Sequence, residues 1–166
     1  VSQRIDYKVA GPTVFNGSAT VTDGHFAFDF VTPLDIGFGG SGARITAYAA
    51  LDSIDAVFLR DSLTVSQAIA ENNDSVGPTI RYTVGDRTNF VSGDAAMTGE
   101  ELRLTLSDSS GINLAGAMGH GITLEVDGQV EETINLTSHF AYVTNSYQTG
   151  SLAYPLTGLS AGAHEF

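Results

Sequence analysis

The sequence contains no cysteine and no tryptophan in its 166 residues. Without cysteine there is no disulfide framework, no thiolate metal site and no cysteine nucleophile. Without tryptophan the chain also lacks a landmark of antibody-type domains, the ring that packs on their disulfide. No apolar run approaches the roughly 18 residues of a membrane-spanning helix. No basic-then-apolar leader is visible, so we expect any signal peptide to have been removed or to lie upstream.

Basic residues are also scarce. Seven Lys and Arg stand against 19 Asp and Glu, which gives a formal net charge of −12. A chain this acidic repels the phosphates of nucleic acids and the headgroups of anionic lipids. We therefore expect no nucleic-acid partner and no membrane insertion.

What the sequence does contain is typical of short strands joined by tight turns. Apolar residues make up 42 % of the chain, enough to form a core, and glycine occurs 19 times. β-Branched and aromatic residues alternate with polar ones between clusters of Gly, Asn, Asp and Pro. This composition predicts an all-β fold.

Period-two alternation marks the individual strands. The clearest is Phe26–Phe30, where three Phe rings share one face and should be buried, after a hairpin turn at Asp23-Gly24. A second Asp-Gly turn is expected at Asp127-Gly128. The other predicted strands are Ser2–Ala10, Val14–Thr22, Ala43–Ala50, Ala56–Val65, Ile80–Val84, Leu102–Leu106, Ile122–Val126, Gln129–Leu136 and Thr149–Leu156.

A change of pattern at 66–77 indicates a boundary. The segment SQAIAENNDSVG is rich in Asn, Asp and Ser and shows no sustained alternation. We therefore predict two tandem β-sandwich modules, 1–72 and 73–166, of which the second is immunoglobulin-like. Because only five or six strands are apparent in 73–166, we expect Ala163–Phe166 to begin a further strand whose continuation is missing.

No arrangement of residues suited to catalysis is apparent. The four histidines, His25, His120, His139 and His164, form no HExxH or HxH pattern. Ser62, Ser66 and Ser92 lack the context of a nucleophile elbow, and the glycines of 37–42 lack the Lys-Ser/Thr of a phosphate loop. We therefore expect no catalytic residue and no bound cofactor or metal in this chain.

One segment resembles a calcium loop. Asp108, Ser110 and Asn113 are spaced as oxygen ligands, but no acidic ligand follows at the distance an EF-hand requires. The alternative is a turn in which the Asp and Asn side chains cap local N–H groups. We predict the turn, with Asp108 and Asn113 as the calcium candidates.

Five segments together resemble a known family. They are NGSATVTDGHFAFDFVTPLDI, GPTIRYTV, FVSG, LSDSSGIN with GHGITLEVDG, and GSLAYPLTGLSAGAHEF. In this order and spacing, from Asn16 onward, they resemble the C-terminal β-rich part of PorU-type proteins. These are gingipain-like cysteine peptidases that act as the sortase of the bacterial type IX secretion system. The family usually has an acidic residue after the Gly-His pair, where this chain has Gly121.

The resemblance implies a location and a role. Members of the family are exposed at the cell surface and associated with the outer membrane. They cleave a C-terminal sorting signal from cargo and transfer the cargo to a lipid-borne anionic sugar. Their catalytic Cys and His lie in an upstream peptidase domain, so this chain itself is expected not to be an enzyme. We expect it to support that domain and to present a surface to outer-membrane secretion components.

Two other functions stay open from the residues alone. A calcium-stiffened adhesin or surface spacer would use similar modules. A carbohydrate-binding module would need exposed aromatic rings on a sheet face, for which the residues to inspect are Tyr7, Tyr48, Tyr82 and Phe58.

Overall fold

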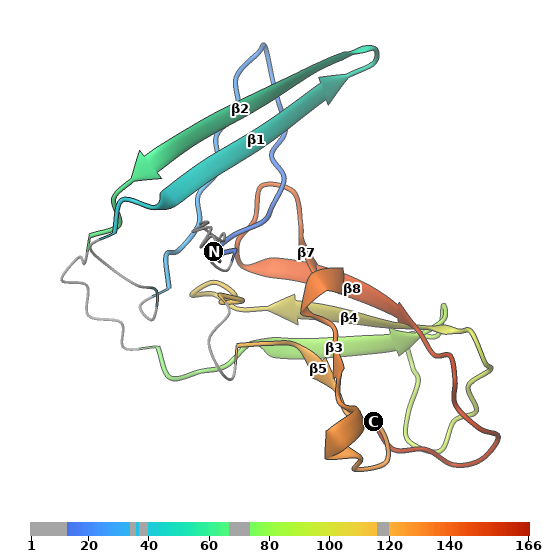
Figure 1. Ribbon diagram of the computed structural model, residues 1–166. Coiled ribbons are helices and arrows are strands. Elements are labelled where there is room, and N and C mark those ends of the chain that lie inside the picture. Colours follow the sequence, from blue (N-terminus) through green and yellow to red (C-terminus); the bar gives the residue numbers. More distant parts are fainter. Residues whose placement is uncertain (1–12, 34–35, 37–39, 67–73, 116–119) are drawn as a thin grey trace, which may run out of the picture. The chain divides into compact units, whose positions relative to one another are not determined.

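A computed structural model of the chain describes residues 13–33, 36, 40–66, 74–115 and 120–166. Within these ranges the regular elements are strands and two short 3₁₀ helices (Figure 1). The fold is all-β, as the sequence predicts. Contacts along the chain group it into two units, one formed by the described residues up to Pro33 together with Ser75–Phe166, and one within Leu34–Asp74.

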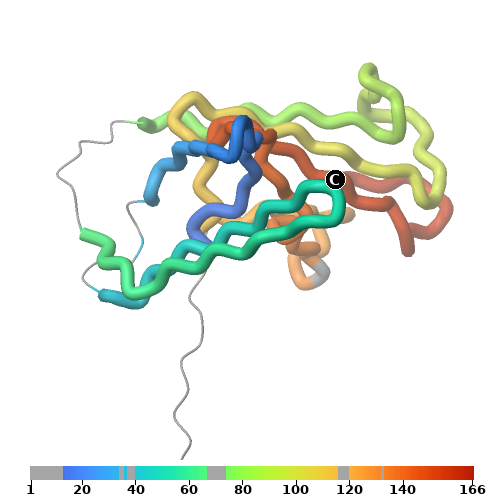
Figure 2. Tube along the Cα trace, turned by 90° about the horizontal axis from the view of Figure 1, so that it is seen from above, coloured from blue at the N-terminus to red at the C-terminus, as the bar shows by residue number. Residues whose placement is uncertain are grey.

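The second unit is a long antiparallel hairpin. It consists of β1 (Ala43–Leu51) and β2 (Ile54–Leu63), which run side by side along their whole length (Figure 2). Both strands were predicted. The turn between them contains Asp52 with a positive φ of 49°. This left-handed conformation is tolerated by Asp better than by most residues.

The first unit is built on a four-stranded antiparallel sheet in the order β3-β4-β8-β7. Its strands are β3 (Thr79–Val84), β4 (Glu101–Ser107), β8 (Thr149–Pro155) and the short β7 (Ala141–Tyr142). β3 lies at one edge, because β4 is its partner on one side only. Three of these strands match predicted ones.

A smaller layer packs on this sheet. It contains the two-residue pair β5 (Thr123–Leu124) and β6 (Ile134–Asn135) and the 3₁₀ helices η1 (Val130–Glu132) and η2 (Thr137–His139). The longer strands predicted at 122–126 and 129–136 are reduced to these short pairs. Residues 129–132 turn into η1 instead of extending, so the ladder between the two segments is short.

The core lies between the two layers, in a sandwich-like arrangement. The sheet contributes alternate side chains, including Leu102 and Leu106 of β4 and Leu152 of β8. The smaller layer contributes Leu124, Leu136 and Phe140. Leu136 has no exposed surface at all, and no other large side chain described is as fully buried.

Both predicted Asp-Gly turns are confirmed. Asp23 and Gly24 have φ angles of 50° and 77°, and Thr22 and His25 exchange two backbone hydrogen bonds of 2.9 and 3.0 Å across the turn. Asp127 and Gly128 have φ angles of 54° and 67°. Positive φ at both central positions is the signature of the type I′ turn that Asp-Gly favours.

The grouping of residues 13–33 differs from the predicted division at 72/73. These residues group with the part of the chain that was expected to form the second module. Ser18 Oγ lies 3.0 Å from Thr144 Oγ1, and the N–H of Thr20 donates to Asn145 Oδ1 at 3.0 Å. Contacts between residues 125 and 126 positions apart therefore fix the segment, and the sequence pattern carries no sign of such pairing.

Three strand predictions were wrong, and a fourth is untested. Val14–Thr22 and Phe26–Phe30 form no strand, although 18–20 is hydrogen-bonded to 144–145. Ala163–Phe166 is not a strand either, since its only backbone bond to another segment in the described residues joins Asp127 to Glu165. Ser2–Ala10 lies outside the described residues. The immunoglobulin-like topology stays a prediction.

Candidate interaction surfaces

Three of the chain's phenylalanines form an exposed ladder. The rings of Phe26 and Phe28 lie with centroids 6.3 Å apart, and those of Phe28 and Phe30 lie 6.1 Å apart, all nearly parallel. Their exposed fractions are 50 %, 38 % and 38 %. The prediction that this stripe is buried on a sheet face is therefore wrong.

The physical reason lies in the backbone. Residues 26–33 form no regular structure and pair with no strand in the described part of the chain, so no sheet face places their rings in a core. The rings cover one another instead. Phe15 joins them to the core, because its ring stacks on that of Phe30 at 5.1 Å and meets the ring of the buried Tyr142 at a tilt, with centroids 4.8 Å apart.

A second apolar area lies at the β3 edge of the sheet. Ile80 and Tyr82 share the inner face with Val84, yet they are 61 % and 49 % exposed while Val84 is buried. An open groove of about 410 Å³ lies beside Tyr82, and its lining also includes Leu104, Leu152 and His139. The smaller layer thus covers only part of the inner face.

The β1–β2 hairpin is apolar on both sides. Tyr48 and its partner Val57 share one face, and Phe58, opposite Ala47, lies on the other. The ribbon exposes seven large apolar side chains: Ile45, Tyr48, Leu51, Ile54, Val57, Phe58 and Leu59. A two-stranded ribbon has little stability alone, and contiguous exposed apolar surface marks sites of contact with other chains or domains.

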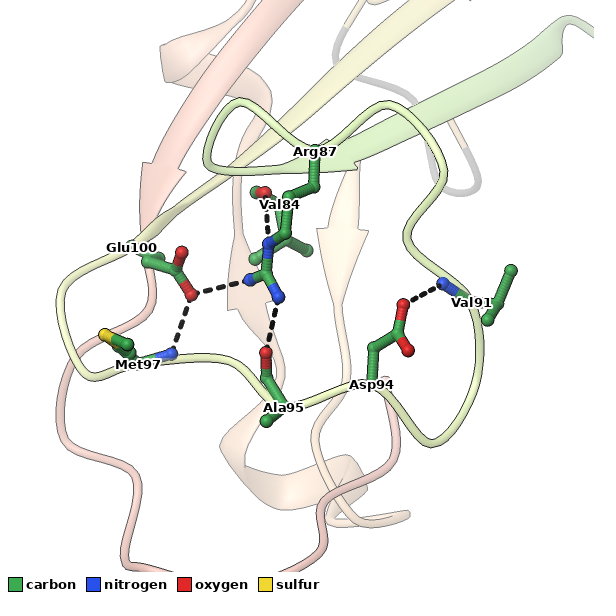
Figure 3. Close-up of polar contacts among 7 residues, drawn as sticks. All are labelled: Val84, Arg87, Val91, Asp94, Ala95, Met97 and Glu100. Atoms are coloured by element: carbon green, nitrogen blue, oxygen red, sulfur yellow. Dashed lines mark hydrogen bonds and ion pairs between the residues drawn. The ribbon is translucent and has the colours of Figure 1, made fainter.

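The connection between β3 and β4 is held by one arginine (Figure 3). The Arg87 guanidinium points into the loop, donating to the carbonyls of Val84 and Ala95 and to Glu100 Oε2, the last at 2.7 Å. Glu100 Oε2 also accepts the N–H of Met97 at 2.7 Å. Charged hydrogen bonds of this kind are stronger than neutral ones, so residues 85–100 are fixed although they lack regular structure.

The calcium candidates cap their own loop. The carboxylate of Asp108 accepts the N–H of Ser110 at 2.8 Å, and Asn113 Oδ1 accepts the N–H of Ala115 at 3.0 Å. These are the local bonds that the turn interpretation predicts. No group of three acidic, His or Cys side chains positioned for a metal ion occurs among the residues described. The absence of a bound metal stays a prediction.

The histidines are not brought together. His25 follows the exposed turn at Asp23-Gly24, and His139 meets the ring of Tyr154 edge-on at 5.5 Å. His164 pairs with Asp127. His120 lies in an irregular segment before β5.

Two of the aromatic residues considered for carbohydrate binding do not share a sheet face. Tyr48 and Phe58 lie on opposite faces of the hairpin. Tyr82 belongs to the other unit, and Tyr7 lies outside the described residues.

Ser62, one of the serines considered as a nucleophile, donates a hydrogen bond to the neighbouring Asp61 at 3.3 Å.

The sequence did not predict two features of the structure: the hydrogen bonds of Arg87 and the contact between Asp127 and His164. Their partners are 13 and 37 positions apart. The Asp-Gly pair at 127–128 signals a turn but does not indicate what contacts the turn. Ion pairs of this kind leave no periodic signal in a sequence.

Comparisons with known proteins give one likeness. A solved structure described as "Crystal structure of dimeric latent PorU from Porphyromonas gingivalis" matches with a TM-score of 0.51 and 29 % sequence identity. The match covers 87 % of this chain and 14 % of that chain, so the present sequence spans about one seventh of its length. No family model matches, and no curated protein matches. The likeness indicates a PorU-related region, in agreement with the resemblance read from the sequence.

No helix in the described residues is long and apolar enough to cross a bilayer.

Proposed function

We propose that the chain is a non-catalytic β-sandwich part of a PorU-type sortase of the type IX secretion system. In this role it supports an upstream cysteine peptidase domain and presents an interaction surface. The observation that carries the proposal is the 29 % identity over 87 % of the chain to one seventh of PorU. The segment resemblance from Asn16 to Phe166 points to the same family.

The composition of the chain supports the non-catalytic role. A cysteine peptidase requires a thiolate nucleophile, and this sequence contains no cysteine. In a PorU-type protein the reaction would therefore be carried by another part of the polypeptide. The match to only 14 % of the PorU chain agrees with a domain inside a longer protein.

The exposed surfaces support a role in contacts. The Phe26–Phe30 ladder exposes several large apolar side chains, and so, separately, does the β1–β2 ribbon; such surfaces are typical of interfaces between domains or chains. We propose that they face the peptidase domain or outer-membrane secretion components. The corresponding location is extracytoplasmic, at the bacterial cell surface and associated with the outer membrane.

The coding sequence upstream provides the first test. We expect it to encode a peptidase domain with a paired Cys and His. A gene that instead continues into repeated spacer modules, or into an unrelated enzyme, would refute the proposal.

Hydrogen–deuterium exchange provides the second test. The 166-residue chain is compared with the same residues in the full-length polypeptide. We expect added protection around Phe26–Phe30 or along β1–β2 in the longer protein, and no change around the buried Leu136, which serves as the internal control. Identical exchange throughout would show that these surfaces contact nothing in the parent.

A further inference from the structure

The C-terminal segment is held to the turn after β5 by three hydrogen bonds, and a fourth bond closes the segment on itself. His164 Nδ1 lies 2.7 Å from Asp127 Oδ2, and His164 Nε2 lies 2.9 Å from the carbonyl oxygen of Ser160. The backbone adds two bonds of 2.8 Å, from the N–H of Glu165 to Asp127 Oδ1 and from the N–H of Asp127 to the carbonyl of Glu165. Both carboxylate oxygens of Asp127 are thus engaged.

The positions of these atoms require an additional proton. A carbonyl oxygen can only accept, and an ionised carboxylate can only accept. Both ring nitrogens of His164 therefore have to donate, which the neutral imidazole cannot do. In either neutral tautomer one nitrogen lone pair would face an oxygen lone pair at 2.7 or 2.9 Å. The complete set of bonds exists only with one proton more than a neutral His beside a carboxylate.

The surroundings favour the positive charge on the ring. Asp127 is the charged side chain that pairs with His164, and the side chain of His164 is only 17 % exposed. Other carboxylates in the neighbouring sequence are Glu125 and Glu131, before and after the turn, and Glu165. None of these three forms an ion pair with His164 in the described structure.

One glycine precedes the segment that the bonds hold, and another lies within it. Gly158 has a φ of 80° and Gly162 a φ of 155°. Both angles lie where other residues are strained, and glycine can leave them at little cost. The chain between the end of β8 and His164 can therefore swing once the bonds at Asp127 are lost.

We propose that Asp127, Ser160, His164 and Glu165 form a proton-dependent clasp. When His164 is doubly protonated, the clasp closes the segment 160–165 onto the turn at 127–128. When His164 loses its second proton, one of the two ring contacts becomes repulsive, so the closed form is weakened and the segment opens more often. The device does not depend on the proposed function of the chain.

The pH range follows from the two titrating groups. The hydrogen bond to Asp127, followed by that to Ser160, raises the pKa of His164 above 6.5. The hydrogen bond from His164, followed by that from Glu165 N–H, lowers the pKa of Asp127 below 3.8. A raised histidine pKa stabilises the closed form fully below 6.5, and the effect disappears as the pH rises through the folded-state value. The lowered pKa of Asp127 stabilises it above 3.8, and that effect disappears in acid. The clasp is therefore closed between these limits and opens on the alkaline side.

Backbone amide exchange measured by NMR between pH 5 and 9 tests the clasp. The amides of Asp127 and Glu165 are followed, with rates corrected for the intrinsic effect of pH, and the ring of His164 is titrated in the same samples. We expect protection to be highest near pH 5–6 and to decrease on the order of tenfold for each unit by which the pKa of His164 exceeds 6.5. Protection that stays constant over this range, or a His164 midpoint at or below 6.5, would overturn the proposal.

Three variants separate the clasp from general stability. His164→Gln should show weak protection of both amides at every pH, and Asp127→Asn should move the midpoint of His164 down toward 6.5. His25→Gln, which removes an exposed histidine from a distant turn, should behave like the original chain. The amide of Leu136 reports whether each variant is folded. Persistence of the pH dependence in His164→Gln would show that another group controls the segment.

Discussion

Replacement of Leu136 by Ala should be among the most damaging single changes in this chain. Leu136 is fully buried between β6 and η2, and it contacts the core that the four-stranded sheet and the smaller layer share. Its backbone is fixed as well, because its N–H donates to the carbonyl of Ile122 at 2.8 Å. The backbone bond limits how far the site can collapse around the missing atoms.

The expected magnitude follows from these contacts. Truncating a fully buried Leu removes its transfer free energy and leaves a cavity, which together cost about 3–5 kcal/mol. For a chain of this size each kcal/mol lowers the Tm by about 2–4 °C, so a decrease of roughly 6–20 °C should follow. Urea denaturation gives the free energy of unfolding, and an unchanged slope shows that the folded state is the same.

Two further variants make the measurement decisive. Leu51→Ala deletes the same atoms at a highly exposed position of the hairpin and should change stability by less than about 0.5 kcal/mol. Leu136→Val removes less volume and should cost about 1 kcal/mol, which keeps the result readable if Leu136→Ala does not fold. A loss below about 1 kcal/mol for Leu136→Ala would mean that the two layers do not share this core.

Four other changes test separate parts of the structure. Tyr142→Phe removes the hydroxyl that donates to the carbonyl of Ile112 at 2.6 Å and should cost about 1–2 kcal/mol in urea denaturation. Burial raises the pKa of Tyr142 above 10.0, so the original chain should lose stability as the pH rises beyond 10.0, and the Phe variant should lose less. Phe15→Ala should cost about 3 kcal/mol because the ring joins the ladder to the core, whereas Phe26→Ala should cost less than about 1 kcal/mol because the ring is half exposed; equal losses would contradict this ranking. Arg87→Lys should speed amide exchange across 85–100 without changing exchange in β8, because a lysine cannot make the three separate bonds of the guanidinium. Added Ca²⁺ should shift the Tm by no more than about 1–2 °C, and a larger shift abolished by Asp108→Ala would show that the loop binds calcium.

Local patterns in the sequence predicted the parts of the fold that depend on near neighbours. The alternation in β1, β2, β3, β4 and β8 was sufficient to locate those strands, and both Asp-Gly pairs form the turns that their residues favour. In each case the determining contacts lie within one strand or one turn. Such contacts leave a period of two or a fixed dipeptide in the sequence.

The errors occurred where distant partners decide the outcome. Phe26–Phe30 shows the strongest alternation in the chain, yet it pairs with no strand among the residues described, and its rings stack on one another. Side-chain periodicity shows which residues share a face but not whether anything covers that face. The clasp between Asp127 and His164 was invisible for a related reason, because 37 positions separate its members.

The interrupted first unit has a consequence for how the chain folds. Ser18 contacts Thr144, 126 positions later, and the whole β1–β2 hairpin lies between them in the sequence. At 5–20 residues per second a ribosome needs roughly 6 to 25 s to add that length. The N-terminal segment must wait for its partners during this time, with the ring of Phe15 still separated from Tyr142. Because closing so long a loop is also slow, docking of residues 13–33 should be a late folding event. Until then the phenylalanines are available to holding chaperones, and the hairpin can form first.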